Sequence, residues 1–150
     1  MYQNFDYIDV KKIDEAIENS VFDMIREDNQ LLFRKESHIG SLFKMYYIKS
    51  SPLLDLLHLQ FGKDLKFRIQ TQTTGYQPIH IDPSRTFAIN YYLDLGGENC
   101  FTHFYPTVTS TIPLESVKIK SKSWCRLNVK TAHNVVGITG TRIAITVCDG

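Results

Sequence analysis

The sequence has few cysteines and no long apolar run, and these absences exclude several classes of protein. Its three cysteines, Cys100, Cys125 and Cys148, show no Cys-x-x-Cys spacing. This argues against a zinc knuckle or a disulfide framework and suits a reducing compartment. No apolar run approaches the roughly 18 residues of a membrane-spanning helix. The start of the chain lacks the pattern of a secretory signal peptide, so we expect a cytoplasmic protein without a membrane partner.

The net charge is also small. Lysine and arginine total 17 and aspartate and glutamate 16, which leaves +1. Bulk charge therefore gives no strong signal for a nucleic-acid partner. One row of lysines, Lys118, Lys120 and Lys122, could touch nucleic acid. Its alternation with Val117 and Ile119 favours a solvated edge strand, where lysines block edge-to-edge pairing.

The first part of the chain contains two helical patterns. With 150 residues, of which 43% are hydrophobic, the chain is long enough for one domain with a sizeable core. Ile13, Ile17 and Val21 recur at helical spacing, which predicts an amphipathic helix over about residues 10–27 with Asp9 as its N-cap.

The second helix is marked more clearly. Ser51 is a suitable N-cap, Pro52 suits the first helical position, and Gly62 predicts the end. Residues 31–49 are ambiguous, although residues 43–48 could form a strand. We therefore predict a helical support over about residues 1–62.

The remainder, about residues 63–150, has the period-two alternation and frequent turns of short strands. About eight such strands indicate a sandwich, barrel or jelly roll. The fold class is thus mainly β with N-terminal helices, or α+β by content. The expected strands include residues 65–72, 86–95, 100–105, 123–130, 132–138 and 141–147.

His80 and Asp82 form the first candidate site. In a strand, residues two apart point to the same face, so an imidazole and a carboxylate could bind one cation there. His-x-Asp alone is weak evidence, because it is common by chance and fits a polar surface strand equally well.

Two later residues strengthen this candidate. If residues 132–147 formed a simple hairpin with a turn at residues 137–138, His133 and Arg142 would face one side. Two histidines and one carboxylate can occupy three positions of an octahedral metal and leave three open. A guanidinium nearby is suited to binding a carboxylate through two hydrogen bonds.

In combination, these elements resemble the core signature of the iron(II)/2-oxoglutarate-dependent dioxygenases, in particular their prolyl-hydroxylase-like branch. The resemblance covers about half the chain. Its elements stand in the expected order: His80-Ile81-Asp82, Asn90-Tyr91-Tyr92-Leu93-Asp94, Gly96-Gly97, His133-Asn134-Val135 and Arg142-Ile143-Ala144-Ile145-Thr146-Val147.

The resemblance implies a double-stranded β-helix, a barrel of the jelly-roll or cupin type. In that fold the last two strands lie in opposing sheets, so it replaces the flat hairpin considered above. His133 and Arg142 would still line one cavity.

The resemblance also implies roles for individual residues. His80, Asp82 and His133 would be the Fe(II) ligands and so the catalytic centre, with 2-oxoglutarate and O2 as co-substrates. Arg142 would bind the distal carboxylate of 2-oxoglutarate, and Tyr92 would donate to it. The remaining candidates are Thr146 and Asn90 for the co-substrate, one of Gln70 and Gln72 near it, and His103, which is expected to be mostly structural.

The implied activity is hydroxylation of an aliphatic C–H bond, coupled to conversion of 2-oxoglutarate to succinate. The substrate could be a prolyl or other peptide side chain, a protein, a small molecule or a modified nucleobase. The alternatives are a non-catalytic, cupin-type protein that binds a metal or small ligand, and a pure interaction domain. The oligomeric state stays open.

Overall fold

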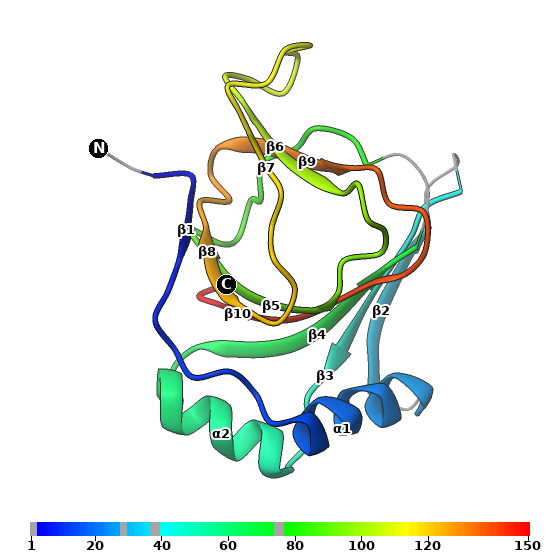
Figure 1. Cartoon of the computed structure of the whole chain (residues 1–150), viewed down its shortest axis with the longest axis vertical. Coiled ribbons are helices and arrows are strands. Elements are labelled where there is room, and N and C mark those ends of the chain that lie inside the picture. The colour runs from blue at the N-terminus through cyan, green and yellow to red at the C-terminus, as the bar shows by residue number, and fades with distance from the viewer. Residues whose placement is uncertain (1–2, 28–29, 37–39, 74–76) are drawn as a thin grey trace.

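The computed structural model describes residues 3–27, 30–36, 40–73 and 77–150. Two helices lie on one face of a large antiparallel sheet, and a small sheet lies over part of the other face (Figure 1). The chain is thus mainly β with two helices, as predicted. The described strands pair into two separate sheets, so the pairing does not show the closed barrel that the resemblance implies.

The first helix, α1 (Glu15–Arg26), is shorter than predicted. Its N-cap position is Asp14 and not Asp9. The preceding residues are extended because Trp124 holds them: its indole Nε1 donates to the Lys11 carbonyl at 3.2 Å, and its own carbonyl accepts from the Ile8 amide at 3.1 Å. Ile13 lies in this extended segment and is nevertheless buried. Its position therefore extended the helical spacing of apolar residues beyond the true start of the helix.

The second helix, α2 (Pro52–Phe61), has the bounds that the sequence predicted. The Ser51 hydroxyl accepts a hydrogen bond from the Leu54 amide at 3.3 Å. Gly62 follows the helix with a φ of +79°, a conformation that favours glycine. Both helices pack on the large sheet around a core that includes Val21, Met24 and Leu57.

The large sheet has seven strands, all paired antiparallel. In spatial order these are β1 (Phe5–Tyr7), β8 (Trp124–Leu127), β5 (Ala88–Asp94), β10 (Arg142–Cys148), β4 (Lys66–Gln72), β3 (Leu42–Tyr47) and β2 (Leu31–Glu36). Three of them, β1, β2 and β3, come from the part predicted as helical support. That part therefore supplies sheet as well as helices, and the ambiguous residues 31–49 are largely strand.

The small sheet has the order β7 (Glu115–Val117), β6 (Phe101–Tyr105) and β9 (Ala132–Val136). A second core cluster, which includes Tyr92, Phe104 and Ala144, joins residues of the two sheets. His133 lies on β9 and Arg142 on β10, so they belong to different sheets and not to one hairpin. The lysine row is not a strand beyond Val117, and Lys122 has a φ of +56°.

The His80 stretch also differs from the prediction. It is not a regular strand; His80 makes one isolated antiparallel bridge with His133. Pro78 and Pro83 flank it, and proline has no N–H to donate to a ladder. The predicted break at residues 73–75 falls partly on residues 74–76, which lie outside the described residues.

Within the described ranges, no helix is long and apolar enough to cross a bilayer.

Candidate metal and co-substrate site

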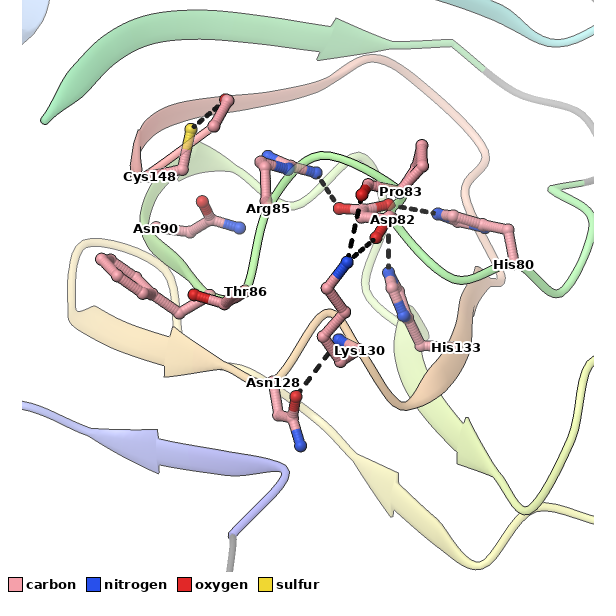
Figure 2. Close-up of polar contacts among 12 residues, drawn as sticks. His80, Asp82, Pro83, Arg85, Thr86, Asn90, Asn128, Lys130, His133 and Cys148 are labelled. Carbon is pink, nitrogen blue, oxygen red and sulfur yellow. Dashed lines mark hydrogen bonds and ion pairs between the residues drawn. The ribbon is translucent and has the colours of Figure 1, made fainter.

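The structure brings His80, Asp82 and His133 together. Asp82 Oδ1 lies 3.4 Å from His80 Nε2 and 4.0 Å from His133 Nε2. One ligand atom from each residue lies within 4.8 Å of the other two, a spacing that could hold one metal ion. In Figure 2 the two imidazoles point toward the Asp82 carboxylate, His80 from the right and His133 from below.

Backbone hydrogen bonds on both sides of Ile81 fix this cluster. The His80 and His133 amides each donate to the other's carbonyl, at 3.0 and 2.9 Å. The Asp82 amide donates to the Val129 carbonyl at 3.1 Å. The Ile81 side chain is 44% exposed, whereas Asp82 is buried. The alternation expected for a strand therefore holds over these three residues although no ladder forms.

The second nitrogen of each imidazole has a backbone partner. His80 Nδ1 lies 2.9 Å from the Pro78 carbonyl oxygen and His133 Nδ1 lies 2.7 Å from that of Thr131. These carbonyls can only accept, so each Nδ1 carries the proton and donates. A neutral ring then has its lone pair on Nε2, the atom nearest Asp82, whereas a protonated His80 ring also carries a proton on Nε2 and donates it to the Asp82 carboxylate. Such outer hydrogen bonds are typical of histidines that bind metals.

The three groups have perturbed pKa values. Burial alone would raise the pKa of Asp82. The hydrogen bond with His80 and the charge of Arg85 have the larger effect, and they lower this pKa from 3.8 to about 2. Burial also opposes protonation of His80, yet the Asp82 and Pro78 partners raise its pKa above 6.5. Burial lowers the pKa of His133, which keeps that ring neutral. An anionic carboxylate and a neutral imidazole are both ready-made metal ligands.

Two cations next to the cluster were missed by the sequence analysis. Arg85 Nη2 pairs with Asp82 Oδ2, the oxygen that does not face His133. Lys130 Nζ donates to the carbonyls of Asp82 and Pro83, at 2.9 and 3.1 Å (Figure 2). The sequence carried one signal, an arginine three residues after the candidate carboxylate. Arg85 thus leaves Oδ1 directed toward the two histidines.

A cavity of about 890 Å³ extends from this cluster to Arg142. Arg142 is 6% exposed, and its Nη1 donates to the Leu95 carbonyl at 3.1 Å. Its guanidinium carbon lies 4.3 Å from the centroid of the Tyr92 ring. A Cβ on Gly96, whose φ is +81°, would lie 2.9 Å from the Arg142 amide nitrogen. Gly96 therefore allows the close approach that places Arg142 in the cavity wall.

The wall between Arg142 and the cluster contains buried polar atoms without partners. Asn90 Nδ2 donates to the Tyr92 hydroxyl at 2.9 Å, but Asn90 Oδ1 has no partner in the described part of the chain. The same holds for Thr146 Oγ1 and Thr102 Oγ1. All four residues line the cavity. Because unpaired buried polar atoms are costly, such a wall suits a polar ligand. Thr102 had no recognisable signal in the sequence.

The remaining residues that the sequence singled out differ in whether they line the cavity. Gln70 and Gln72 both line the cavity, opposite Ala144 and Arg142 in the β4–β10 register. His103 does not line it; His103 Nδ1 lies 3.1 Å from the Tyr105 hydroxyl. Side chains alternate between the two faces of β6. Thr102 and Phe104 point inward, and His103 lies on the opposite face.

Comparison with known proteins identifies the fold. No protein-family model and no curated protein matches the sequence. Among solved structures, an oxidoreductase of the 2OG-Fe(II) oxygenase family from Burkholderia pseudomallei matches with a TM-score of 0.56 and 12% identity, over 91% of this chain and 78% of that one. A prolyl-4-hydroxylase from Pseudomonas putida matches with a TM-score of 0.58 and 10% identity, over 97% and 91%. This chain therefore has the fold of the 2OG-Fe(II) oxygenases.

Proposed function

We propose that this protein is an Fe(II)- and 2-oxoglutarate-dependent dioxygenase that hydroxylates an aliphatic C–H bond. One observation carries the proposal: His80, Asp82 and His133 form a two-histidine, one-carboxylate cluster at one end of a cavity whose other end holds the buried Arg142. That donor set is typical of non-haem Fe(II) oxygenases. The shared fold supports the same activity.

The metal would be held by three atoms, His80 Nε2, His133 Nε2 and Asp82 Oδ1. The two Nδ1–H groups hold the rings in orientation through the Pro78 and Thr131 carbonyls. With iron and 2-oxoglutarate bound, the centre would supply an oxidant able to hydroxylate an unactivated carbon, with succinate and CO2 as the other products.

The residues on the sheet wall would bind 2-oxoglutarate. Arg142 offers a buried guanidinium for its distal carboxylate, and Tyr92 lies against that guanidinium. Burial raises the pKa of Tyr92, more than the Arg142 charge lowers it, so the hydroxyl stays protonated and able to donate. Thr146 and Asn90 supply the unpaired polar atoms for further hydrogen bonds.

We further propose a double-stranded β-helix as the topology and a peptide side chain, prolyl or other, as the substrate. The facing sheets support the first and the prolyl-4-hydroxylase neighbour supports the second. Residues 1–150 would then form one domain. Three free, buried cysteines fit the cytoplasmic location that the sequence predicts.

The direct test is O2-dependent conversion of 2-oxoglutarate to succinate by the Fe(II)-loaded protein, with and without a peptide library. Asp82→Ala and His133→Ala should abolish turnover and metal binding together. The competing function is a cupin-type protein that binds a metal without catalysis. This alternative predicts metal binding but no thermal stabilisation by 2-oxoglutarate or its unreactive analogue N-oxalylglycine. That result would favour the cupin-type protein over the dioxygenase.

A further inference from the structure

The same cavity also extends over strands β2, β3 and β4 of the large sheet, and this part carries several cations. It is lined by the cations Lys35, Lys66 and Arg68 and by the aromatic side chains Phe33 and Phe43. These residues lie on β2, β3 and β4, strands that the small sheet does not pair with.

Two of these cations lie beside the C-terminal half of β10. In the β4–β10 register Lys66 is opposite Cys148 and Arg68 is opposite Thr146. The end of β10 is joined to the loop that follows Asp82, because the Asp149 carboxylate accepts from the Thr86 amide at 2.9 Å. A Cβ built on Gly150, two residues after Cys148, would lie 3.2 Å from the Arg85 amide nitrogen. Paired strands lie about 4.8 Å apart, so Lys66 lies next to the end of β10 and lines the same cavity as the metal cluster.

Two of these cations have no acidic partner among the described residues. Neither Lys66 nor Arg68 forms an ion pair with any residue in the described part of the chain. Arg68 is held by other contacts: Nη1 donates to the Phe67 carbonyl at 3.0 Å and the guanidinium carbon lies 4.9 Å from the Tyr47 ring centroid. Its remaining N–H groups stay available to a ligand.

The acids of the same cavity do not balance this charge. The described acidic residues in its lining are Asp82, which is paired with Arg85, and Glu36, whose Oε1 lies 4.0 Å from Arg34 Nη1. A cavity lined by more cations than acids concentrates negatively charged ligands.

We infer that the substrate binds with an acidic peptide segment across this cationic part of the sheet, with its carboxylates on Lys66 and Arg68. This inference rests on the proposed function, because it specifies which kind of peptide substrate would reach the metal. The aromatic rings Phe33 and Phe43, whose centroids are 5.8 Å apart, would pack against the apolar side chains of that segment.

Binding of fluorescein-labelled hexaglutamate tests this directly, by fluorescence anisotropy on the full chain loaded with Mn²⁺ and N-oxalylglycine. Hexaglutamine, hexalysine and an oligothymidylate of equal charge are the comparison probes. Hexaglutamate should bind more tightly than the other three, and added salt should weaken it. Binding no tighter than hexaglutamine, or a preference for the oligothymidylate, would overturn the inference.

Charge reversal then locates the binding surface. The double variant Lys66→Glu, Arg68→Glu should weaken hexaglutamate binding at least about tenfold, from the loss of two partly exposed ion pairs. The matched control, Lys63→Glu with Lys118→Glu, changes two exposed lysines that do not line the cavity and should change binding less than about twofold. Equal effects of both pairs would contradict the assigned surface.

Two further measurements separate the possible failures. If the reversed variant does not fold, Lys66→Gln with Arg68→Gln removes the charges without adding acids, and should weaken binding in the same direction. Mn²⁺ and 2-oxoglutarate affinities are measured on the same samples. If both ligands bind normally but hexaglutamate does not, only the present inference fails. If hexaglutamate binds but neither ligand does, the proposed function fails and the acidic-peptide surface stands.

Discussion

Replacing Arg85 with methionine should destabilise the metal-free protein more than the metal-loaded protein. In the metal-free state, Arg85 is the fixed cation next to the Asp82 carboxylate, whose side chain is only 10% exposed. Without Arg85, the negative charge of Asp82 would be left with His80 as its main partner. A bound metal ion supplies positive charge to the same carboxylate. The loss should therefore shrink when metal is present.

The size of the effect follows from the pair. The fall in the pKa of Asp82 from 3.8 to about 2 corresponds to about 2.4 kcal/mol, which contributes fully above about pH 4 and is lost as the pH falls toward 2. His80 contributes more of this than Arg85, so we assign about 1 kcal/mol to Arg85. For 150 residues this lowers Tm by about 2–4 °C. The metal-loaded form should lose less than about half as much.

Thermal unfolding with and without saturating Mn²⁺ measures both values. The control is Lys130→Met, which removes a neighbouring charge that contacts only backbone carbonyls. Its effect on Tm should be similar in both states. The cycle with Asp82→Asn isolates the coupling between Arg85 and Asp82. Equal losses for Arg85→Met in both states would refute the reasoning that Asp82 Oδ1 is a metal ligand.

Three other predictions concern the same cavity. Arg142→Ala should weaken 2-oxoglutarate binding about 100-fold through the loss of charge-assisted hydrogen bonds, while Mn²⁺ affinity measured by calorimetry stays within about twofold. A parallel loss of both affinities would contradict the assignment of Arg142 to the co-substrate. Metal affinity should fall as the pH drops through the raised pKa of His80, because the metal must then displace a proton from the imidazole. It should fall again at lower pH as His133 becomes protonated. Co²⁺ titrations in buffers of different ionisation enthalpy count the protons released on binding. Thr146→Val should raise the free energy of unfolding without ligand by about 1 kcal/mol, since it removes an unpaired buried hydroxyl, and should weaken 2-oxoglutarate binding; denaturant unfolding and calorimetry measure the two effects.

The sequence predicted well those features that depend on local chemistry. Ser51, Pro52 and Gly62 set the bounds of α2 because capping and turn preferences act over a few residues. The alternation around Ile81 placed His80 and Asp82 on one side, and the structure agrees although no regular strand forms there.

Features that depend on distant partners were not predictable in this way. The start of α1 moved because Trp124, far along the chain, holds the preceding residues in an extended form. Residues 31–49 were ambiguous because β3 pairs with β4, more than twenty residues further along the chain, and β2 joins the sheet through β3. Likewise, the spacing of Arg85 from Asp82 was a signal for a nearby cation, but it could not show that Arg85 would pair with Oδ2, and no signal showed that Thr102 would face the cavity.

The family resemblance supplied what spacing alone could not. Considered as a flat hairpin, His133 and Arg142 would have been cross-strand neighbours. The structure places them on β9 and β10 of different sheets, where both line one cavity. The iron and 2-oxoglutarate roles of these residues stay predictions.

Anaerobic titration of 2-oxoglutarate into the Fe(II)-loaded protein, followed by visible absorption and by calorimetry, tests the central claim most directly. We predict a new visible absorption that needs both Fe(II) and 2-oxoglutarate, is absent in Asp82→Ala, and requires far more 2-oxoglutarate in Arg142→Ala. Fe(II) binding that 2-oxoglutarate leaves unchanged, both in absorption and in affinity, would contradict the proposed function.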